Sequence, residues 1–197
     1  MRRRIACLLL ACLPAAVSAA DSPVNISGVR TDDLRLYYYN YLSFIVPHTV
    51  RSFANSVAWQ RRTFGWSPSE PTILLLEDFA DMGGAAAFAA PRSMLVFDVG
   101  PPSRAFETFA VSERVYSLMN HELVHVVQSD LASSQDRAWR RFYLGKVRAE
   151  PQHPESILYS YQTIPRFTAP RWYTEGGAVF METWMAGGLG QIGRAHV

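Results

Sequence analysis

The residues best suited to chemistry lie in the segment His-Glu-Leu-Val-His at positions 121–125. On an α-helix, His121 and His125 stand four positions apart, so their rings project from one face a single turn apart. Two imidazoles at this spacing can bind one zinc ion, at about 2.0–2.1 Å each. Glu122 is rotated away from the metal and would face a water bound to it. The pattern is typical of zinc hydrolases in which the glutamate is the general base.

A catalytic zinc site needs a third protein ligand and leaves one position open for water. The candidates that follow His125 are His153, Asp130, Asp136, Glu150, Glu155, Glu175 and Glu182. Asp130 lies on another face of the same helix, and His153 stands between two prolines in a loop, a poor platform for a rigid ligand. Glu175 stands in the first turn of a predicted helix, where the small residues that follow permit close backbone approach. It is the best placed of the candidates.

These two motifs, in this order, resemble the gluzincin metallopeptidases, and in particular the bacterial peptidase-MA-like domains. The second motif, Trp-x-x-Glu-Gly-x-Ala, occupies residues 172–178, and the resemblance covers roughly residues 45–187. It implies an α+β, thermolysin-like catalytic domain in which a small mixed sheet packs on the zinc-binding helix. It also implies that His121, His125 and Glu175 bind Zn²⁺ and that Glu122 is the general base.

The chain also departs from the pattern of that family. Forty-nine residues separate His125 from Glu175, a longer spacer than in thermolysin or the gluzincin aminopeptidases. The Gly-x-Met-Glu-Asn motif of those aminopeptidases is not present, so aminopeptidase activity is not implied. The family's transition-state donor, a Tyr or His, usually follows the third ligand in a C-terminal domain.

Two further polar residues lie close to the motifs. Glu182, two turns past Glu175, is expected either to form a hydrogen bond to a zinc-binding histidine or to be an ordinary surface acid. Asn120, the neighbour of His121, has a similar status: it is expected either to form a hydrogen bond to a zinc-binding histidine or to be an ordinary polar side chain.

The sequence therefore predicts a zinc peptidase that hydrolyses a peptide or protein substrate. Zinc would lower the pKa of a bound water toward about 7, and Glu122 would take its proton and pass it to the leaving amine. One alternative is a non-catalytic zinc-binding module of the cell envelope, used for protein interaction. The intact Glu122 argues against it, because a structural site needs no base. The other alternative is a helical core with two hydrogen-bonded histidines and no metal.

The first 20 residues carry the pattern of a secretory signal. Arginines at 2–4 precede the apolar run 5–13, and Ser-Ala-Ala at 18–20 forms a small-residue cleavage site. The apolar run is too short to span a bilayer as a mature helix. We therefore expect an exported protein, periplasmic or extracellular, of a Gram-negative-type envelope and without a transmembrane span. Residues 9–12 also resemble a lipobox, so a lipid anchor at Cys12 is a second interpretation.

The composition of the chain argues against several other classes of protein. The chain has 197 residues, of which 49% are hydrophobic and 13% aromatic, which predicts a folded core rather than disorder. The formal net charge is +2, but removal of the arginines at 2–4 leaves 16 basic against 17 acidic residues. A nearly neutral mature chain has no basic field for nucleic acid, so we exclude nucleic acid as a partner. Both cysteines, Cys7 and Cys12, fall in the signal, so the mature chain would have neither disulfides nor a thiolate zinc site.

Residues 21–45 are expected to form an extended leader and an aromatic segment, and residues 46–190 an incomplete metallopeptidase-like catalytic domain. The aromatic run 34–46 is compatible with either a strand or the start of a buried helix. Residues 191–197 look like the translation of a sequencing-adapter oligonucleotide. We therefore expect a non-native tail there, and a natural chain that continues past about residue 190 into a C-terminal helical part. His196, within this tail, is not considered as a ligand.

Apolar periodicity predicts a helix over 47–64, which Gly65 ends, and a last helix over 172–185. Short apolar runs predict strands at 72–76 and 94–99. The second of these strands is expected at a sheet edge, where an extended peptide could lie against it.

The other segments carry weaker signals. The alanine-rich stretch 78–90 has no clear secondary structure, whereas one or two helices are expected within 103–130, with Ser112 as a cap. Residues 129–148 are predicted to form a solvated amphipathic helix with a few aromatic anchors. A short helix is expected over 156–162.

Overall fold

The computed structural model describes residues 25–101, 114–164, 166 and 168–186. This part of the chain has the expected α+β fold, a mixed five-stranded sheet packed against α-helices. The signal expected at 1–20 with Cys12, the helix cap Ser112 and the tail expected at 191–197 lie outside the described residues. None of the described helices is both long and apolar enough to cross a bilayer.

The five strands are β1 (Ile26–Arg30), β2 (Leu34–Tyr39), β3 (Thr72–Glu77), β4 (Gly84–Phe88) and β5 (Met94–Asp98). They form one sheet in the order β1-β2-β3-β5-β4, with β2, β3 and β5 parallel and an antiparallel strand at each edge. Side chains along β3 and β5 alternate between buried and half-buried, because only one face of the sheet packs on helices. Leu36, Leu74 and Leu95 stand opposite one another on that face and are completely buried.

The sheet begins within the first segment, where a strand and a buried helix were both compatible with the aromatic run, and the structure shows a strand. Residues 26–39, expected as leader and aromatic segment, form β1 and β2 and pair with β3. Leu34 and Leu36 of β2 belong to the same apolar core as β3 and β5. The boundary expected at residue 46 therefore does not separate this segment from the structure that carries the later motifs.

The expectation that the strand at 94–99 lies at a sheet edge is wrong. β5 lies between β3 and β4, and the edge strand is β4, from the alanine-rich stretch that carried no clear signal. Alanine and glycine have low strand propensity, so this segment is a strand because of its pairing with β5 rather than its composition.

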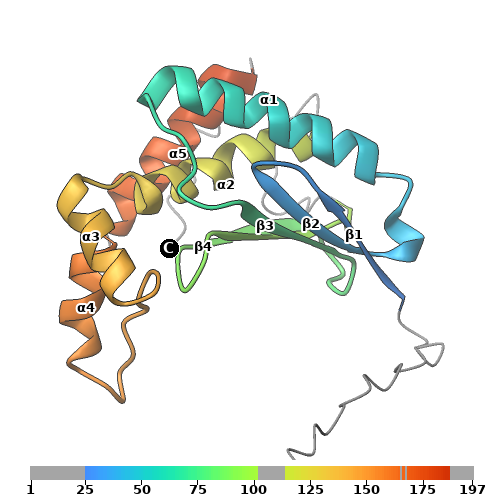
Figure 1. Cartoon of the computed structure of the whole chain (residues 1–197). Helices are drawn as coiled ribbons and strands as arrows, with labels where there is room; N and C mark the ends of the chain where they lie inside the picture. The colour runs from blue at the N-terminus through green and yellow to red at the C-terminus, as the bar shows by residue number, and fades with distance from the viewer. Residues whose placement is uncertain (1–24, 102–113, 165, 167, 187–197) are drawn as a thin grey trace, which may run out of the picture.

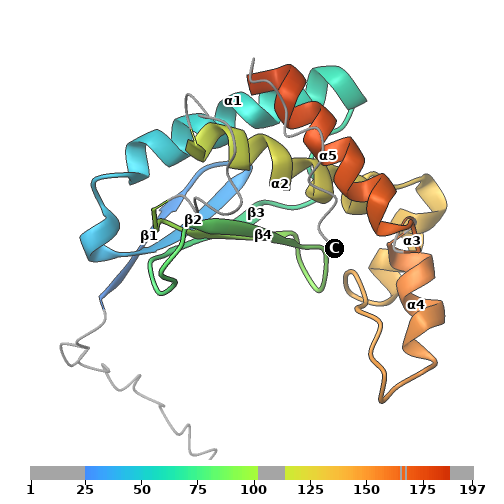
Figure 2. The same ribbon diagram turned by 180° about the vertical axis from the view of Figure 1, so that it is seen from behind.

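Three long helices cover one face of the sheet: α1 (Val46–Phe64), α2 (Arg114–Asp130) and α5 (Arg171–Ala186). Figures 1 and 2 show them gathered on the same side, with α2 between α1 and α5. Leu123 and Met119 of α2 are completely buried against the apolar core, which makes α2 the central helix. The predictions of helices over 47–64 and 172–185 are confirmed to within a residue or two, and Gly65 ends α1 in a left-handed conformation with φ of 58°.

The expectation of one solvated helix over 129–148 is wrong. α2 runs on to Asp130, and a shorter helix, α3 (Ser134–Phe142), begins at a capping box formed by Ser133 and Asp136. Together with α4 (Ser156–Thr163), α3 lies beyond one end of the sheet (Figure 1). Arg140 and Lys146, expected in solvent, are only 9% and 4% exposed.

Asp130, only 3% exposed, explains why these two cations are buried. Its Oδ1 lies 3.1 Å from both Arg140 Nη1 and Lys146 Nζ. Its Oδ2 accepts hydrogen bonds from the indole nitrogen of Trp66 at 3.1 Å and from the backbone nitrogen of Ser69 at 2.8 Å. This network ties the C-terminal end of α2 to the turn before β3 and to the segment around α3. Burial alone would raise the pKa of Asp130, but Lys146 and the hydrogen bonds from Ser69 outweigh burial and lower the pKa.

We expect Asp130→Asn to lower the free energy of unfolding by about 3–5 kcal/mol, because Arg140 and Lys146 would stay buried without their shared counter-charge. The loss depends on pH. The folded-state pKa of Asp130 is depressed, so its contribution is complete above the unfolded-state pKa of about 3.9 and is lost as the pH falls through the folded-state value. Urea unfolding of both proteins between about pH 7 and about pH 3 measures the difference.

The exposed Asp81 provides a matched control. Asp81→Asn removes the same charge outside the network and should change the free energy of unfolding by no more than about 0.5 kcal/mol. Equal losses in the two variants, or a loss in Asp130→Asn that does not shrink toward acid pH, would contradict the assignment.

Candidate metal centre

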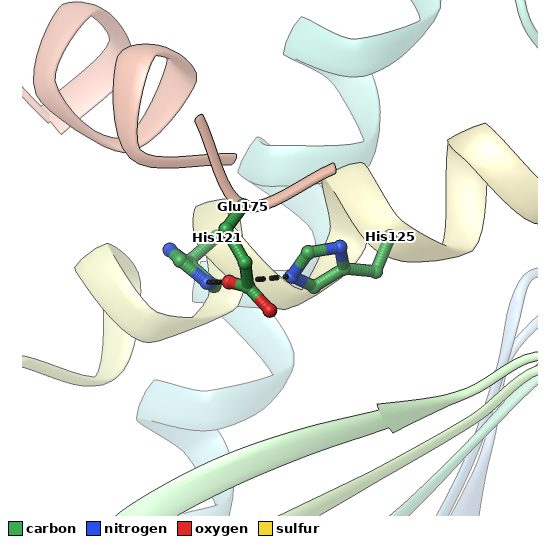
Figure 3. A group of neighbouring side chains, drawn as sticks. All are labelled: His121, His125 and Glu175. Carbon is green, nitrogen blue, oxygen red and sulfur yellow. Dashed lines mark ion pairs between the residues drawn. The ribbon is translucent and has the colours of Figure 1, made fainter. Parts of the chain in front are cut away.

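The side chains of His121, His125 and Glu175 meet between α2 and α5 (Figure 3). Both histidines project from one face of α2, and Glu175 reaches them from near the start of α5. Glu175 Oε2 lies 3.4 Å from His121 Nε2 and 3.5 Å from His125 Nε2. One nitrogen from each ring and one carboxylate oxygen lie within 4.8 Å of one another. Two imidazoles and one carboxylate are a donor set that a catalytic Zn²⁺ takes, so these residues fit the expected metal.

The position of the two histidines follows from the apolar pattern of α2. Leu123, Val126 and Val127 point into the core and are at most 3% exposed, which fixes the rotation of the helix. The same rotation turns His121 and His125 toward α5, where they are half-buried. Val124 packs on Ala178 and Met181 of α5 in a small apolar cluster between the two helices.

Glu182 lies on the side of α5 that faces α2. Its carboxylate contacts the Nδ1 atom of His121, the ring nitrogen that does not face Glu175. Its Oε2 lies 3.2 Å from His121 Nδ1, and its Oε1 accepts a hydrogen bond of 2.6 Å from Ser117 Oγ. A carboxylate at Nδ1 favours the tautomer with the proton there, which leaves the lone pair of Nε2 for a metal. The geometry therefore favours the hydrogen-bonding interpretation of Glu182 over that of an ordinary surface acid.

Gln128 has the corresponding place at His125, and the sequence analysis missed it. Its Oε1 lies 3.4 Å from His125 Nδ1, and its Nε2 donates a hydrogen bond of 3.3 Å to the carbonyl oxygen of Thr174. A Cβ at Gly177 would come within 3.1 Å of Gln128 Nε2, so the glycine keeps room for this amide. Gln128 follows His125 by three residues, a spacing that puts the two side chains on one face of a helix and could have indicated their contact. The contact of Gln128 with α5 appears only in the fold. Ser117 was missed because its contact with α5 also appears only in the fold.

The expectation that Asn120 is bonded to a zinc-binding histidine is not met. Asn120 is completely buried, and neither its amide nitrogen nor its amide oxygen has a hydrogen-bond partner among the described residues. Its contribution is through the backbone, where its carbonyl oxygen accepts a bond of 3.3 Å from Gln60 of α1.

The other candidate ligands lie elsewhere. Asp130 belongs to the buried network with Lys146, and Asp136 caps α3. His153 and Glu155 pair with each other in an exposed loop at 3.4 Å. Among the candidates, Glu175 is therefore the one whose carboxylate reaches both histidines.

Glu122, the expected general base, is 7% exposed and lies between the two histidines in sequence. Its pKa is raised to about 7: burial is the largest cause, the charge of His121 acts in the opposite direction, and the charges of Glu175 and Glu182 act with burial. A divalent cation nearby would favour the carboxylate form.

The pKa values of the two histidines shift in opposite directions. For His121, burial lowers the pKa, but the hydrogen bond that it donates to Glu182 and the charges of the three glutamates outweigh burial and raise it. For His125, burial and the neighbouring His121 lower the pKa, so this ring is the one that favours the neutral form. A neutral imidazole is the form that binds a metal.

A cleft of about 820 Å³ opens in front of His121, Glu122 and His125. It is lined by β4 and the two alanines that follow it, by α2, by the first turn of α5 and by residues from the segment 148–169. Ala85 and Ala87 lie in register with Phe97 and Leu95 of β5, so the edge strand presents small side chains on the face that contacts α2. The site is therefore accessible from one side.

No family model matches the chain, and no curated protein is significantly similar to it in sequence. The assignment of the metal centre therefore rests on the geometry described above.

We expect Glu175→Ala to reduce zinc affinity more than the roughly 10–100-fold that the loss of an outer partner of a ligand causes, because it removes a direct donor. Competition with a fluorescent chelator measures the affinity. Glu155→Ala, which truncates an exposed glutamate outside the centre, should bind zinc as the wild type does. Equal affinity in Glu175→Ala and the wild type would mean that the third ligand is another residue.

Gln128→Ala should reduce zinc affinity about 10–100-fold, because His125 loses the group that holds its ring. Gln128→Glu restores an acceptor at the same position and should recover most of the affinity. Chelator competition on both variants, with urea unfolding to check that each is folded, decides the role. Unchanged affinity in Gln128→Ala would show that the amide only packs against Gly177.

Proposed function

We propose that the protein is a zinc-dependent peptidase with a gluzincin-like fold that hydrolyses peptide bonds in an extended substrate. The observation that carries the proposal is the meeting of His121, His125 and Glu175 within 4.8 Å, beside the buried Glu122 and in an open cleft. A small mixed sheet packed on the histidine-bearing helix, which the resemblance implies, supports the proposed fold.

In this proposal His121, His125 and Glu175 hold the metal, and Glu182 and Gln128 hold the two rings in place. When bound, Zn²⁺ supplies a Lewis acid and lowers the pKa of water toward about 7. Glu122 accepts a proton from the attacking water on its carboxylate as the water oxygen bonds to the carbonyl carbon. It then gives that proton to the amine nitrogen as the carbon–nitrogen bond breaks. A proton carrier with a pKa near the working pH is suited to both transfers.

The cleft supports a peptide as the substrate. β4 is an edge strand, and residues 85–90 line the cleft, so a strand edge lies beside the metal centre. An extended peptide can pair with such an edge through its backbone, which places its carbonyl groups at regular intervals along the cleft. The alanines of β4 leave space for the side chains of that peptide.

The burial of Glu122 argues against the alternative of a non-catalytic zinc module. A buried carboxylate is costly when it has no cation to balance it, and a module that only binds a partner needs no such group. Export to the periplasm or the extracellular space is part of the proposal, and its support is the charged, apolar and small-residue pattern of residues 1–20.

Glu122→Gln should retain zinc and lose about 10²–10⁴-fold in kcat, because the amide keeps the shape of the side chain but cannot accept a proton. The measurement is cleavage of a casein-type substrate by the full zinc-loaded chain, together with its zinc content by atomic absorption. Glu155→Gln, the same change at an exposed site, should leave both values unchanged. Full activity in Glu122→Gln would disprove the general-base role, and loss of zinc would mean that this residue also holds the metal centre together.

A further inference from the structure

Among the described residues, three arginines line the cleft: Arg148, Arg166 and Arg171. They come from different parts of the chain, which the fold brings to one cavity. Apart from Glu122 and Glu175, no acidic side chain in the described part of the chain lines this cleft, and no lysine does. The described side chains that line the cleft therefore carry three positive charges against two negative ones when both glutamates are ionised, and a bound Zn²⁺ would increase the excess from +1 to +3.

Arg148 is exposed and forms no hydrogen bond or ion pair with any described residue. Its guanidinium group is therefore free to bind a group that enters the cleft. An arginine without a counter-charge next to an open cavity differs from the usual surface arginine, because ligands in the cavity can reach its planar, five-donor end.

Arg171 stands at the first residue of α5, one turn before Glu175. Its Nε lies 3.7 Å from Glu175 Oε1, while its side chain is 70% exposed. The histidines face the other carboxylate oxygen, Oε2, and the distance from Arg171 is longer than a hydrogen bond, so the N–H groups of Arg171 remain available to a second anion. Arg171 therefore adds a positive charge to the cleft one helical turn from the proposed metal ligand.

Arg166 contributes a fixed charge. Its Nε donates a hydrogen bond of 2.7 Å to the carbonyl oxygen of Gln128, and its Nη2 donates to the carbonyl oxygen of Leu131. Both acceptors lie at the C-terminal end of α2, where a cation is favourable. No carboxylate of the described residues neutralises Arg166, so it adds to the positive potential of the cleft.

We infer that the cleft selects peptides that carry an acidic side chain, Asp or Glu, within a few residues of the bond to be cleaved. The inference rests on the proposed peptidase function and adds its substrate class. Arg148 and Arg171 bind the substrate carboxylate, with the charge-assisted hydrogen bonds that arginine forms most strongly with this group. Arg166 favours the same substrates through its charge alone.

The test uses short quenched fluorescent peptides with blocked ends, in which Glu or Gln stands at each position in turn. The two side chains have nearly the same shape and differ in charge. For the zinc-loaded full chain, kcat/KM should be about tenfold higher for Glu than for Gln at one or two positions near the cleaved bond. Raising NaCl from about 0.05 M to about 0.5 M should reduce this preference, because salt screens exposed charges.

Arg148→Ala should reduce the preference for Glu severalfold, and Arg148→Ala combined with Arg171→Ala should bring the ratio near to one. Arg148→Lys keeps the charge and should retain part of the preference. Arg141→Ala removes an equally exposed arginine of α3, outside the cleft, and should leave the ratio unchanged. Zinc content is measured for each variant, because Arg171 contacts Glu175.

The same peptides are also tested for binding to the zinc-loaded Glu122→Gln chain by fluorescence anisotropy. Cleavage without any preference for Glu would overturn the inference and leave the proposed function standing. Preferential binding of Glu peptides without cleavage by the wild type would support an anionic ligand and overturn the peptidase function. A preference that appears only when the peptide carboxyl terminus is unblocked would overturn the acidic side chain as the recognised group.

Discussion

One constraint governs this structure: α2 must fill the core and carry the histidines of the proposed metal centre at the same time. Leu123 and Met119 are completely buried in the core, while His121 and Glu122 face the cleft from the same few turns. No residue of this helix is fully exposed, so its charged groups and histidines need partners from other elements, whereas the buried amide of Asn120 has no partner among the described residues. The partners of its histidines come from α5, and the partner of its last carboxylate comes from the segment around α3.

The distance between α2 and α5 determines the distances between the two histidines and Glu175. Val124 of α2 packs on Ala178 and Met181 of α5, and a completely buried alanine at this contact allows the two helices to lie close together. Glu175 and Glu182 stand seven residues apart on α5, which is two turns, so both carboxylates face α2. One of them lies at the Nε2 side of the histidines and the other at Nδ1 of His121. The apolar contact of Val124 with α5 therefore sets the positions of the two carboxylates relative to the histidine rings.

Sequence reasoning could predict those features that depend on local pattern. Helical spacing placed His121 and His125 on one face, and the small residues after Glu175 distinguished it from the other acidic candidates. The pattern was insufficient where pairing between distant segments decides the structure. Ala85 and Ala87 are strand residues because they pair with β5. Arg140 and Lys146 are buried because both form ion pairs with the buried carboxylate of Asp130. Charge is commonly a sign of exposure, and here a buried counter-charge reversed that expectation.

The charged groups at Asp130 and those around the histidines of α2 are balanced in different ways. At Asp130, one buried carboxylate meets two cations, so the network is balanced by the protein itself. At the cleft, the carboxylates of Glu122, Glu175 and Glu182 surround two histidines, one of which favours its neutral form. The charges of Glu175 and Glu182 add to burial in raising the pKa of Glu122, so acidic groups outnumber cations in the immediate surroundings of the two histidine rings, although the arginines reverse this balance over the cleft as a whole. A divalent cation held by His121, His125 and Glu175 would balance the acids beside the rings. This local excess of acidic groups supports the proposal of a metal centre over that of a buried polar contact.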